Sequence, residues 1–432
     1  MQAALLASLL WPALASAGTH ITATGQIVFD YDDNISAVPP DAGPIGAFGL
    51  EVSPGFAVYH DAAAERFVLR YSHPVIFYFG HMEQSTDADV ASAIGLFHLT
   101  PLDDLLLDLE ARRQSTNLFG LAASQQTTTE ARQTGDQPMV PLSLSETLRH
   151  DFSETWSLEQ DASAAVTIPT GSNSTQQLVF TGAVSLAPEV VTGSHSFALI
   201  PAFRYTHSEP AANPGGSLLA SERTDQLLPS AMLRWRWDWT VGWGSEARAG
   251  VAVPYVIHQG ISAAPVGGAA IRYDEPGFGI ALEYARDFRP DSVSAQTYYS
   301  DTILLSGTLP ISRDLDIRAA ASTGFAWNRL AALGPTQIVE RADTWVADAS
   351  IGWYPPDLVP SIALRYQHVQ QLAAPAGQVF LFDFSRNVIS LVVGYQYPVV
   401  RETAIARHLP GRVDRSDTAA PESAQPAPRP RP

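Results

Sequence analysis

The stretch Leu315–Asn328, LDIRAAASTGFAWN, alternates between two kinds of side chain. Its odd positions are mostly apolar and end in Phe325 and Trp327, whereas its even positions hold Asp316, Arg318 and small or polar residues. Successive side chains of an extended chain point to opposite faces, so this segment predicts a strand with one oily and one polar face. The alternation is longer than the roughly 5 or 6 residues of a globular strand and matches a tilted strand that crosses a bilayer.

The same pattern recurs along the chain, at residues 105–112, 197–206, 278–285, 345–353 and 361–367. Short breaks rich in Asp, Pro and Gly alternate with longer polar stretches such as 118–138, 208–222 and 373–385. Short turns at one end and longer loops at the other are typical of outer-membrane barrels. We therefore predict an all-β protein, a transmembrane antiparallel up-and-down β-barrel of about 18 strands, within a range of roughly 16 to 20.

Composition limits the other classes. The 432 residues include no Cys, which excludes disulfides and thiolate sites, and only 16% are charged, below the roughly 25% of soluble proteins. After the N-terminus no apolar run is long enough to predict a transmembrane helix. The net charge of -18 argues against nucleic-acid binding, which needs a basic face.

The segment Leu233–Trp243, LRWRWDWTVGW, holds four of the nine tryptophans of the chain. We expect Trp235 and Trp237 to face lipid near the periplasmic end of about the tenth strand, with Arg234 and Arg236 in the lumen. A turn is expected at residues 238–240, after which Trp243 resumes the outward face. The alternative, a tryptophan core stripe of a soluble sheet, is disfavoured because core strands seldom carry two Arg opposite such a stripe.

The alternation sorts side chains into two candidate sets. The candidate lumen-lining residues are Glu51, Arg70, Asp108, Glu110, Arg112, Arg204, Arg234, Arg236, Glu246, Arg248, Arg272, Glu283, Asp316, Arg318, Asp348 and Arg365. The candidate lipid-interface aromatics are Trp235, Trp237, Trp243, Phe325, Trp327, Trp345, Trp353, Tyr395 and Tyr397. Both signs of charge in the lumen suit an uncharged or weakly charged hydrophilic solute, although the charges could also simply pair with one another.

The two ends of the chain differ from the barrel. Residues 1–17 are apolar and end in Ala15-Ser16-Ala17, which predicts a signal peptide cleaved after Ala17, although no basic residue precedes the apolar run. Residues 18–400 form the predicted outer-membrane barrel. Residues 401–432 are rich in Pro, Ala and Arg and predict a disordered periplasmic tail, either an inert linker or a docking arm.

The last strand, NVISLVVGYQYP, places Tyr395 and Tyr397 on its oily face and resembles the closing strand of outer-membrane proteins. It departs from that pattern because a tail follows it. The chain is similar in architecture to the 18-stranded outer-membrane barrels of polysaccharide export. That resemblance implies an outer-membrane conduit for a polysaccharide passenger that works with a periplasmic export protein, and it carries no motif from which a functional residue follows.

Two other functions stay open: a general diffusion porin for small hydrophilic solutes, and a structural or adhesive surface barrel. Enzymatic activity is not expected, because the 11 His are scattered and no hydrolase or zinc motif occurs, and we expect no cofactor. Asp30, Asp32, Asp33 and Asn34 could hold calcium, but no calcium-loop register follows them, so a solvated loop is the favoured interpretation. His60, His73, His98 and His368 are expected near strand ends.

Overall fold

A computed structural model describes most of the chain between Gly18 and Tyr397. The described residues are 18–35, 40, 43–62, 64–82, 85–113, 139–169, 178–209, 224–240, 242–256, 260–261, 263–275, 278–290, 297–312, 319–333, 338–353, 360–374 and 383–397. The predicted signal peptide (1–17) and tail (401–432), and also Asp316 and Arg318, lie outside these residues.

The described residues form 22 β segments. In chain order they are β1 (Thr19–Asp32), β2 (Ala47–Asp61), β3 (Glu65–Ser72), β4 (Val75–Tyr78), β5 (Thr86–Asp87), β6 (Asp89–Thr100), β7 (Asp103–Arg113), β8 (Met139–Ser153), β9 (Trp156–Pro169), β10 (Leu178–Thr192), β11 (His195–Glu209), β12 (Thr224–Thr240), β13 (Trp243–Ala252), β14 (Tyr255–Val256), β15 (Gly260–Ile261), β16 (Ala264–Glu275), β17 (Phe278–Pro290), β18 (Thr297–Ser312), β19 (Ala319–Leu333), β20 (Ile338–Trp353), β21 (Ser361–Ala374) and β22 (Phe384–Tyr397).

Four pairs of segments are interrupted strands: β3 with β4, β5 with β6, β13 with β14, and β15 with β16. Pro74 and Pro254 lie at two of these interruptions, because proline has no N–H to give to the ladder. The wall therefore has 18 strands. Each pairs antiparallel with its chain neighbours, and β1 pairs with β22 to close the ring, which confirms the predicted barrel and its strand number.

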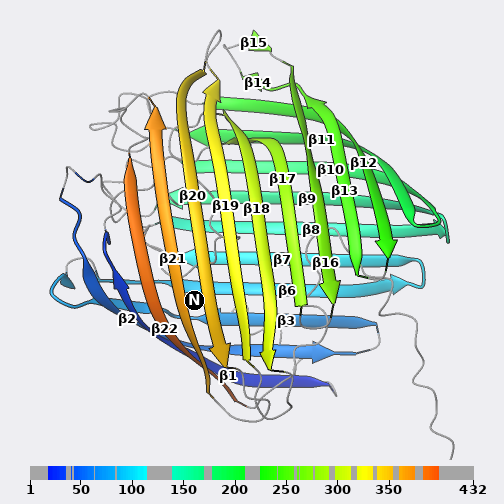
Figure 1. Ribbon diagram of the computed structural model, residues 1–432. Coiled ribbons are helices and arrows are strands. Elements are labelled where there is room, and N and C mark those ends of the chain that lie inside the picture. The colour runs from blue at the N-terminus through cyan, green and yellow to red at the C-terminus, as the bar shows by residue number, and fades with distance from the viewer. Residues whose placement is uncertain are drawn as a thin grey trace, which may run out of the picture. The chain divides into compact units, whose positions relative to one another are not determined.

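Figure 1 shows β17–β22 on the near wall crossing β3–β9 on the far wall, as expected when all strands of a closed barrel tilt in one sense about its axis. Tight connections, such as those at residues 101–102 and 193–194, lie at the end of the barrel that holds Thr19 and Tyr397. We call this the turn end. The strand ends that are joined by the longer connections, such as Arg113 with Met139 and Glu209 with Thr224, lie at the other end, which we call the loop end.

One expected turn is wrong. We predicted a turn at residues 238–240, but β12 continues to Thr240 and β13 begins at Trp243. Asp238 pairs with Gly244, and the register shifts between Asp238 and Thr240, so a β-bulge absorbs the extra residue. Trp239, at the bulge, is exposed and its ring lies between those of Trp237 and Trp243.

The acidic stretch at the end of β1 joins the first strand of the barrel to the last, β22. The Asp32 carboxylate is fully buried and accepts hydrogen bonds from the Arg386 guanidinium, with Nε at 2.9 Å. The Asp33 carboxylate accepts from the backbone N–H and the side-chain amide of Asn387, at 2.7 and 2.6 Å. Asn34 donates to the backbone oxygen of Ser385. The expected solvated loop is therefore wrong for this stretch, because Asp32, Asp33 and Asn34 form a clasp across the β1–β22 seam.

The wall has two distinct faces. Arg234 on β12 approaches Glu159 on β9, with 3.7 Å between Nη1 and Oε1, although two strands lie between them. Strands three positions apart are about 14 Å apart along the wall, so side chains can meet over that distance only where they converge on the concave side. Arg234 and the residues in its register therefore lie on the concave face, and the alternate residues lie on the convex face. The end of β17 is an exception, because Phe288 is in the alternate register and packs on the concave residues Ala252 and Val266.

Candidate functional site

The convex face is oily and exposed. Leu233 is 65% exposed, and exposed apolar side chains continue in the same register on every neighbouring strand. Examples are Phe197, Leu199 and Phe203 on β11, Leu282 and Tyr284 on β17, Ile362 and Leu364 on β21, and Ile389 and Leu391 on β22. A surface of this size that stayed in water would be an aggregation hazard.

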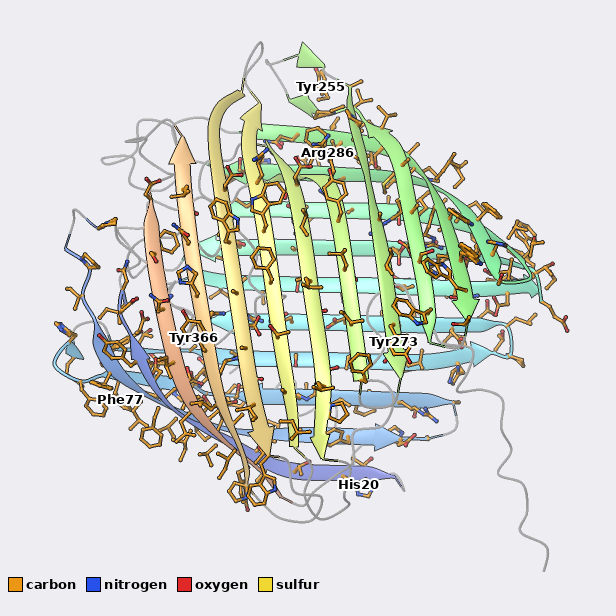
Figure 2. The ribbon with its side chains drawn as sticks, viewed as in Figure 1. His20, Phe77, Tyr255, Tyr273, Arg286 and Tyr366 are labelled. Atoms are coloured by element: carbon orange, nitrogen blue, oxygen red, sulfur yellow. The ribbon has the colours of Figure 1, made fainter. Side chains whose placement is uncertain are left out.

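The tryptophans form a continuous aromatic slab on the convex face at the turn end. Ring centroids are 6.2 Å apart between Trp235 and Trp237, 5.2 Å between Trp237 and Trp239, and 6.1 Å between Trp239 and Trp243. Trp243 then packs on Tyr273 of β16 at 4.8 Å, and Tyr273 is visible on the near wall in Figure 2. The Trp239 indole N–H donates to Ser245 Oγ at 2.9 Å. Sequence reasoning missed Trp239 because it placed a turn there.

The other predicted interface aromatics also lie in the convex register. Phe325 is exposed, and Trp327, Trp345 and Trp353 are half-buried there. Tyr395 is exposed and pairs with Gly25 across the seam. The backbone of Tyr397 follows in the same register, opposite Ala23.

A recurrent polar clamp lies on the convex face near the loop end, and sequence analysis did not detect it. Three strands carry the pattern Arg-Tyr-x-His, at residues 70–73, 204–207 and 365–368. In each, the Tyr hydroxyl and the His Nδ1 reach one carboxylate or amide oxygen at the start of the next wall strand, at 2.7 to 2.9 Å. The acceptors are Asp89, Asp225 and Asn387. Figure 2 shows Tyr366, the tyrosine of the third clamp.

The concave face is polar, and every predicted lumen residue that the structure describes lies in its register. These residues are Glu51, Arg70, Asp108, Glu110, Arg112, Arg204, Arg234, Arg236, Glu246, Arg248, Arg272, Glu283, Asp348 and Arg365. They do not form a single site. Those on β12 and β13 meet one another, whereas Arg70 and Arg365 lie on distant parts of the wall.

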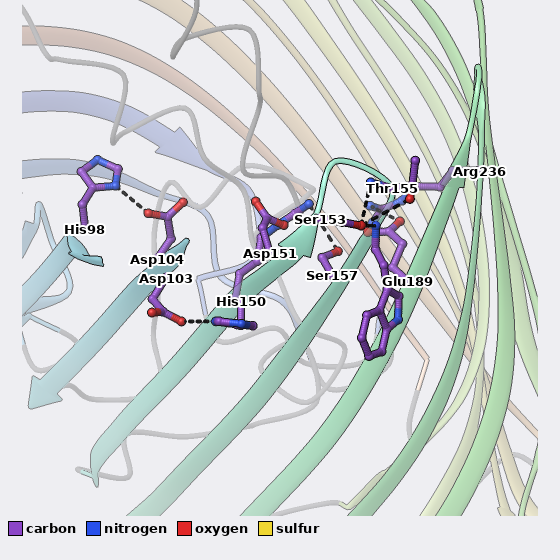
Figure 3. Close-up of polar contacts among 12 residues, drawn as sticks. His98, Asp103, Asp104, His150, Asp151, Ser153, Thr155, Ser157, Glu189 and Arg236 are labelled. Carbon is purple, nitrogen blue, oxygen red and sulfur yellow. Dashed lines mark hydrogen bonds and ion pairs between the residues drawn. The ribbon is translucent and has the colours of Figure 1, made fainter. Parts of the chain in front are cut away.

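The residues on β9–β13 form what we call the charge ladder: Glu159, Glu189, Arg234, Arg236, Glu246 and Arg248. Arg234 contacts Glu159 at 3.7 Å and Glu189 at 3.5 Å. Arg236 also approaches Glu189, at 3.9 Å, and binds Glu246 with its Nε at 2.6 Å, and Arg248 reaches the same Glu246 at 3.0 Å. Figure 3 shows Glu189 and Arg236 of this ladder. The ladder carries three carboxylates and three guanidinium groups, so its formal charges balance.

Burial gives the ladder a structural role. Arg234, Glu159 and Glu189 are each less than 10% exposed, so each charge depends on its partners for compensation. Removing one member of such a group leaves the others uncompensated, which typically costs about 3–5 kcal/mol. Sequence analysis missed Glu159 and Glu189, although Ser157, Glu159 and Asp161 alternate on the polar face as the other candidates do.

Water reaches the concave face on β7–β9. Asp108, Ser143, Ser145 and Ser163 are exposed there, and we call them the open strip. Asp108 pairs with Ser145, and Ser145 pairs with Ser163, so three members lie in one row across the wall. The opposite wall differs, because Thr344, Val346 and Asp348 on β20, and Gln367, Val369 and Gln371 on β21, are buried. Exposed side chains of the concave face therefore cluster on β7–β9, and isolated ones, such as Gln26 on β1 and Thr308 on β18, occur elsewhere.

Histidine–aspartate pairs also occur at the turn end. His98 Nδ1 lies 2.6 Å from Asp104 Oδ1 and His150 Nδ1 lies 2.5 Å from Asp103 Oδ1 (Figure 3). Each joins two neighbouring strands.

Within the described ranges, no three His, Asp or Glu residues are grouped so that they could hold a metal ion. The part of the chain that the structure describes also contains no helix that is long and apolar enough to cross a membrane.

Comparison with known proteins gives likenesses of architecture. No family model and no curated protein matches the sequence. Among solved structures, OccK2 (OpdF) of Pseudomonas aeruginosa, crystallised with glucuronate, is similar at 8% identity over 88% of this chain and 97% of that one, with a TM-score of 0.43. OccK9 (OpdG) of the same organism is similar at 11% identity over 88% of this chain and 98% of that one, with a TM-score of 0.44. The siderophore receptor PirA of Acinetobacter baumannii is similar at 6% identity over 88% of this chain and 80% of that one, with a TM-score of 0.44.

Proposed function

We propose that this chain is an outer-membrane channel through which small hydrophilic solutes diffuse. The observation that carries the proposal is the division of one closed wall into an exposed apolar convex face and a polar concave face with an exposed strip of Asp108, Ser143, Ser145 and Ser163. A closed barrel leaves no strand edge unpaired, so its oily face can lie in lipid. A barrel of this size can enclose an aqueous channel.

The side chains of the concave face suit the passage of small, weakly charged solutes. The charge ladder balances its own charges, and the open strip offers hydroxyls and one carboxylate. A pore lined by one sign of charge selects ions of the other sign, whereas a balanced wall favours neutral polar solutes. The buried side chains on β20 and β21 narrow the accessible path to one side of the lumen, which fits a small solute better than a polymer.

Export of a polysaccharide with a periplasmic partner remains a prediction of the sequence. The tail at 401–432, on which a docking arm would depend, lies outside the described residues. A structural or adhesive surface barrel is the other alternative, and it differs from a channel in that it would not conduct.

Planar-bilayer recording of the purified, refolded full chain tests the proposal. We expect discrete single-channel openings from the protein alone. Ser145→Trp, which places a large side chain on the open strip, should lower the conductance about twofold. Leu309→Trp is the matched control, because Leu309 is exposed on the convex face and should leave conductance unchanged. A wild-type barrel that folds and never conducts would rule out the channel and favour the adhesive alternative.

A further inference from the structure

The wall has a sharp corner between β12 and β17. A Cβ on Gly250 of β13 would overlap the backbone oxygen of Ala231, and a Cβ on Gly268 of β16 would overlap that of Tyr284. Both positions face the concave side in the strand register. Glycine inside a strand marks a tight bend or a close approach of two backbones, so these residues let the sheet fold steeply here.

The corner brings together strands that are not neighbours. Phe288 near the end of β17 is fully buried and clusters with Ala252 of β13 and Val266 of β16, and Met232 of β12 packs against the same cluster. Three wall strands separate β11 from β17, yet Arg204 of β11 donates from Nη1 to the backbone oxygen of Phe288 at 2.5 Å. Its Nη2 lies 3.4 Å from Asp287 Oδ2.

This contact must cross the interior. Strands four positions apart are about 19 Å apart along the wall, farther than an arginine side chain reaches. The part of the lumen between β11 and β17, which we call the closed sector, is therefore filled at the level of Arg204. The Arg204 guanidinium and the apolar side chains packed around Phe288 fill it together.

The closed sector borders the water-accessible path. The paired row that contains Asp108, Ser145 and Ser163 continues to Ala183 of β10 and then to Arg204. The Arg204 side chain is 30% exposed and that of Asp287 is 47% exposed, so both remain in contact with water while they touch each other. A solute that moves along the open strip meets this pair at the edge of the strip.

We propose that Arg204 sets the size limit of the conduit by pinning the end of β17 across the lumen. This inference rests on the proposed channel function. Arg204 acts as a positioning residue: its two contacts hold the corner folded, and the folded corner leaves solutes the path beside β7–β9. Without Arg204, the end of β17 loses its polar anchor and the closed sector opens.

The test measures single-channel conductance and the size of polyethylene glycol that still enters the pore, for the refolded full chain. We expect Arg204→Ala to raise conductance about twofold and to admit larger polymers. Arg329→Ala is the matched control, because it removes the same charge from the convex face of β19, outside the lumen, and should leave the polymer limit unchanged. Arg204→Lys keeps the charge but cannot make both contacts, so it should shift the limit in the same direction as Arg204→Ala.

The outcomes separate the two proposals. A wild-type barrel that does not conduct overturns the channel itself. A conducting wild type whose polymer limit is unchanged in Arg204→Ala and Arg204→Lys overturns the size-limit role alone. If Arg204→Ala yields no folded barrel, Phe288→Leu, which keeps an apolar side chain in the cluster, decides: an unchanged limit counts against the proposal and a larger limit supports it.

Discussion

The orientation of the two faces can be tested at Val184, and every functional inference depends on that orientation. Val184 lies near the middle of β10 on the convex face, 43% exposed, and pairs with Ala162 and Phe203. It lies six residues from Val190, which pairs with Trp156 at the turn end. At about 3.4 Å per residue and a tilt of roughly 40°, Val184 is about 15 Å above Val190 along the barrel axis, close to the middle of an apolar band about 25 Å tall.

Replacing Val184 with Arg should therefore lower the free energy of unfolding by about 2–4 kcal/mol, whereas Val190→Arg, near the interface, should lower it by about 0–1 kcal/mol. Equilibrium unfolding in guanidinium of the barrel refolded into lipid vesicles, followed by tryptophan fluorescence, measures both values. Ser163→Arg is the matched control, because Ser163 is exposed on the concave face of the adjacent strand and its replacement should change stability little. In a water-soluble protein, an exposed Val→Arg substitution would be nearly neutral. Equal effects of Val184→Arg and Ser163→Arg would refute the assignment of the faces.

Two further predictions concern buried charges. Arg234→Met should lower the free energy of unfolding by about 3–5 kcal/mol, because it removes the cation that contacts buried Glu159 and leaves buried Glu189 with only the more distant Arg236. Arg248→Ala, at a side chain that is 41% exposed, should lower it by less than about 1 kcal/mol. The same unfolding assay checks this pair, and equal losses would contradict the burial argument. Arg386→Met should destabilise the barrel by a similar 3–5 kcal/mol, approximately, because Asp32 at the seam is fully buried. Protection of the β1 and β22 amides from hydrogen exchange should fall first in this variant, and a loss confined to other strands would contradict the seam clasp.

The sequence predicts the strands and their faces because the signal is local. Alternation in a stretch such as 315–328 depends only on the pleat of a single strand, and a slip by one residue would move every side chain to the wrong face. The strand number follows from the turn and loop residues that separate such stretches. The error at residues 238–240 is also local in origin: Asp is favoured in turns, but the alternation of Trp237 and Trp239 with Asp238 continues, and β12 ends only at Thr240.

The contacts of the concave face could not be predicted in the same way. Glu159 and Arg234 are 75 positions apart in the numbering and meet because β9 and β12 converge inside the barrel. The Arg204 contact with β17 depends on a corner that only the packing around Gly250 and Gly268 reveals. Alternation gives the face on which each charge lies, whereas its partner depends on the curvature of the closed wall.

These contacts give a physical reason for arginine, and not lysine, at these positions. Every one of the 26 basic residues is Arg. Arg234 reaches Glu159 with one terminal nitrogen and Glu189 with the other, and Arg204 divides its two terminal nitrogens between Phe288 and Asp287. A lysine ammonium is a compact point charge without the rigid fork that spans two such partners. Arg234→Lys should therefore preserve the balance of charge in the ladder and still lose stability, whereas a ladder held by net charge alone would tolerate the change.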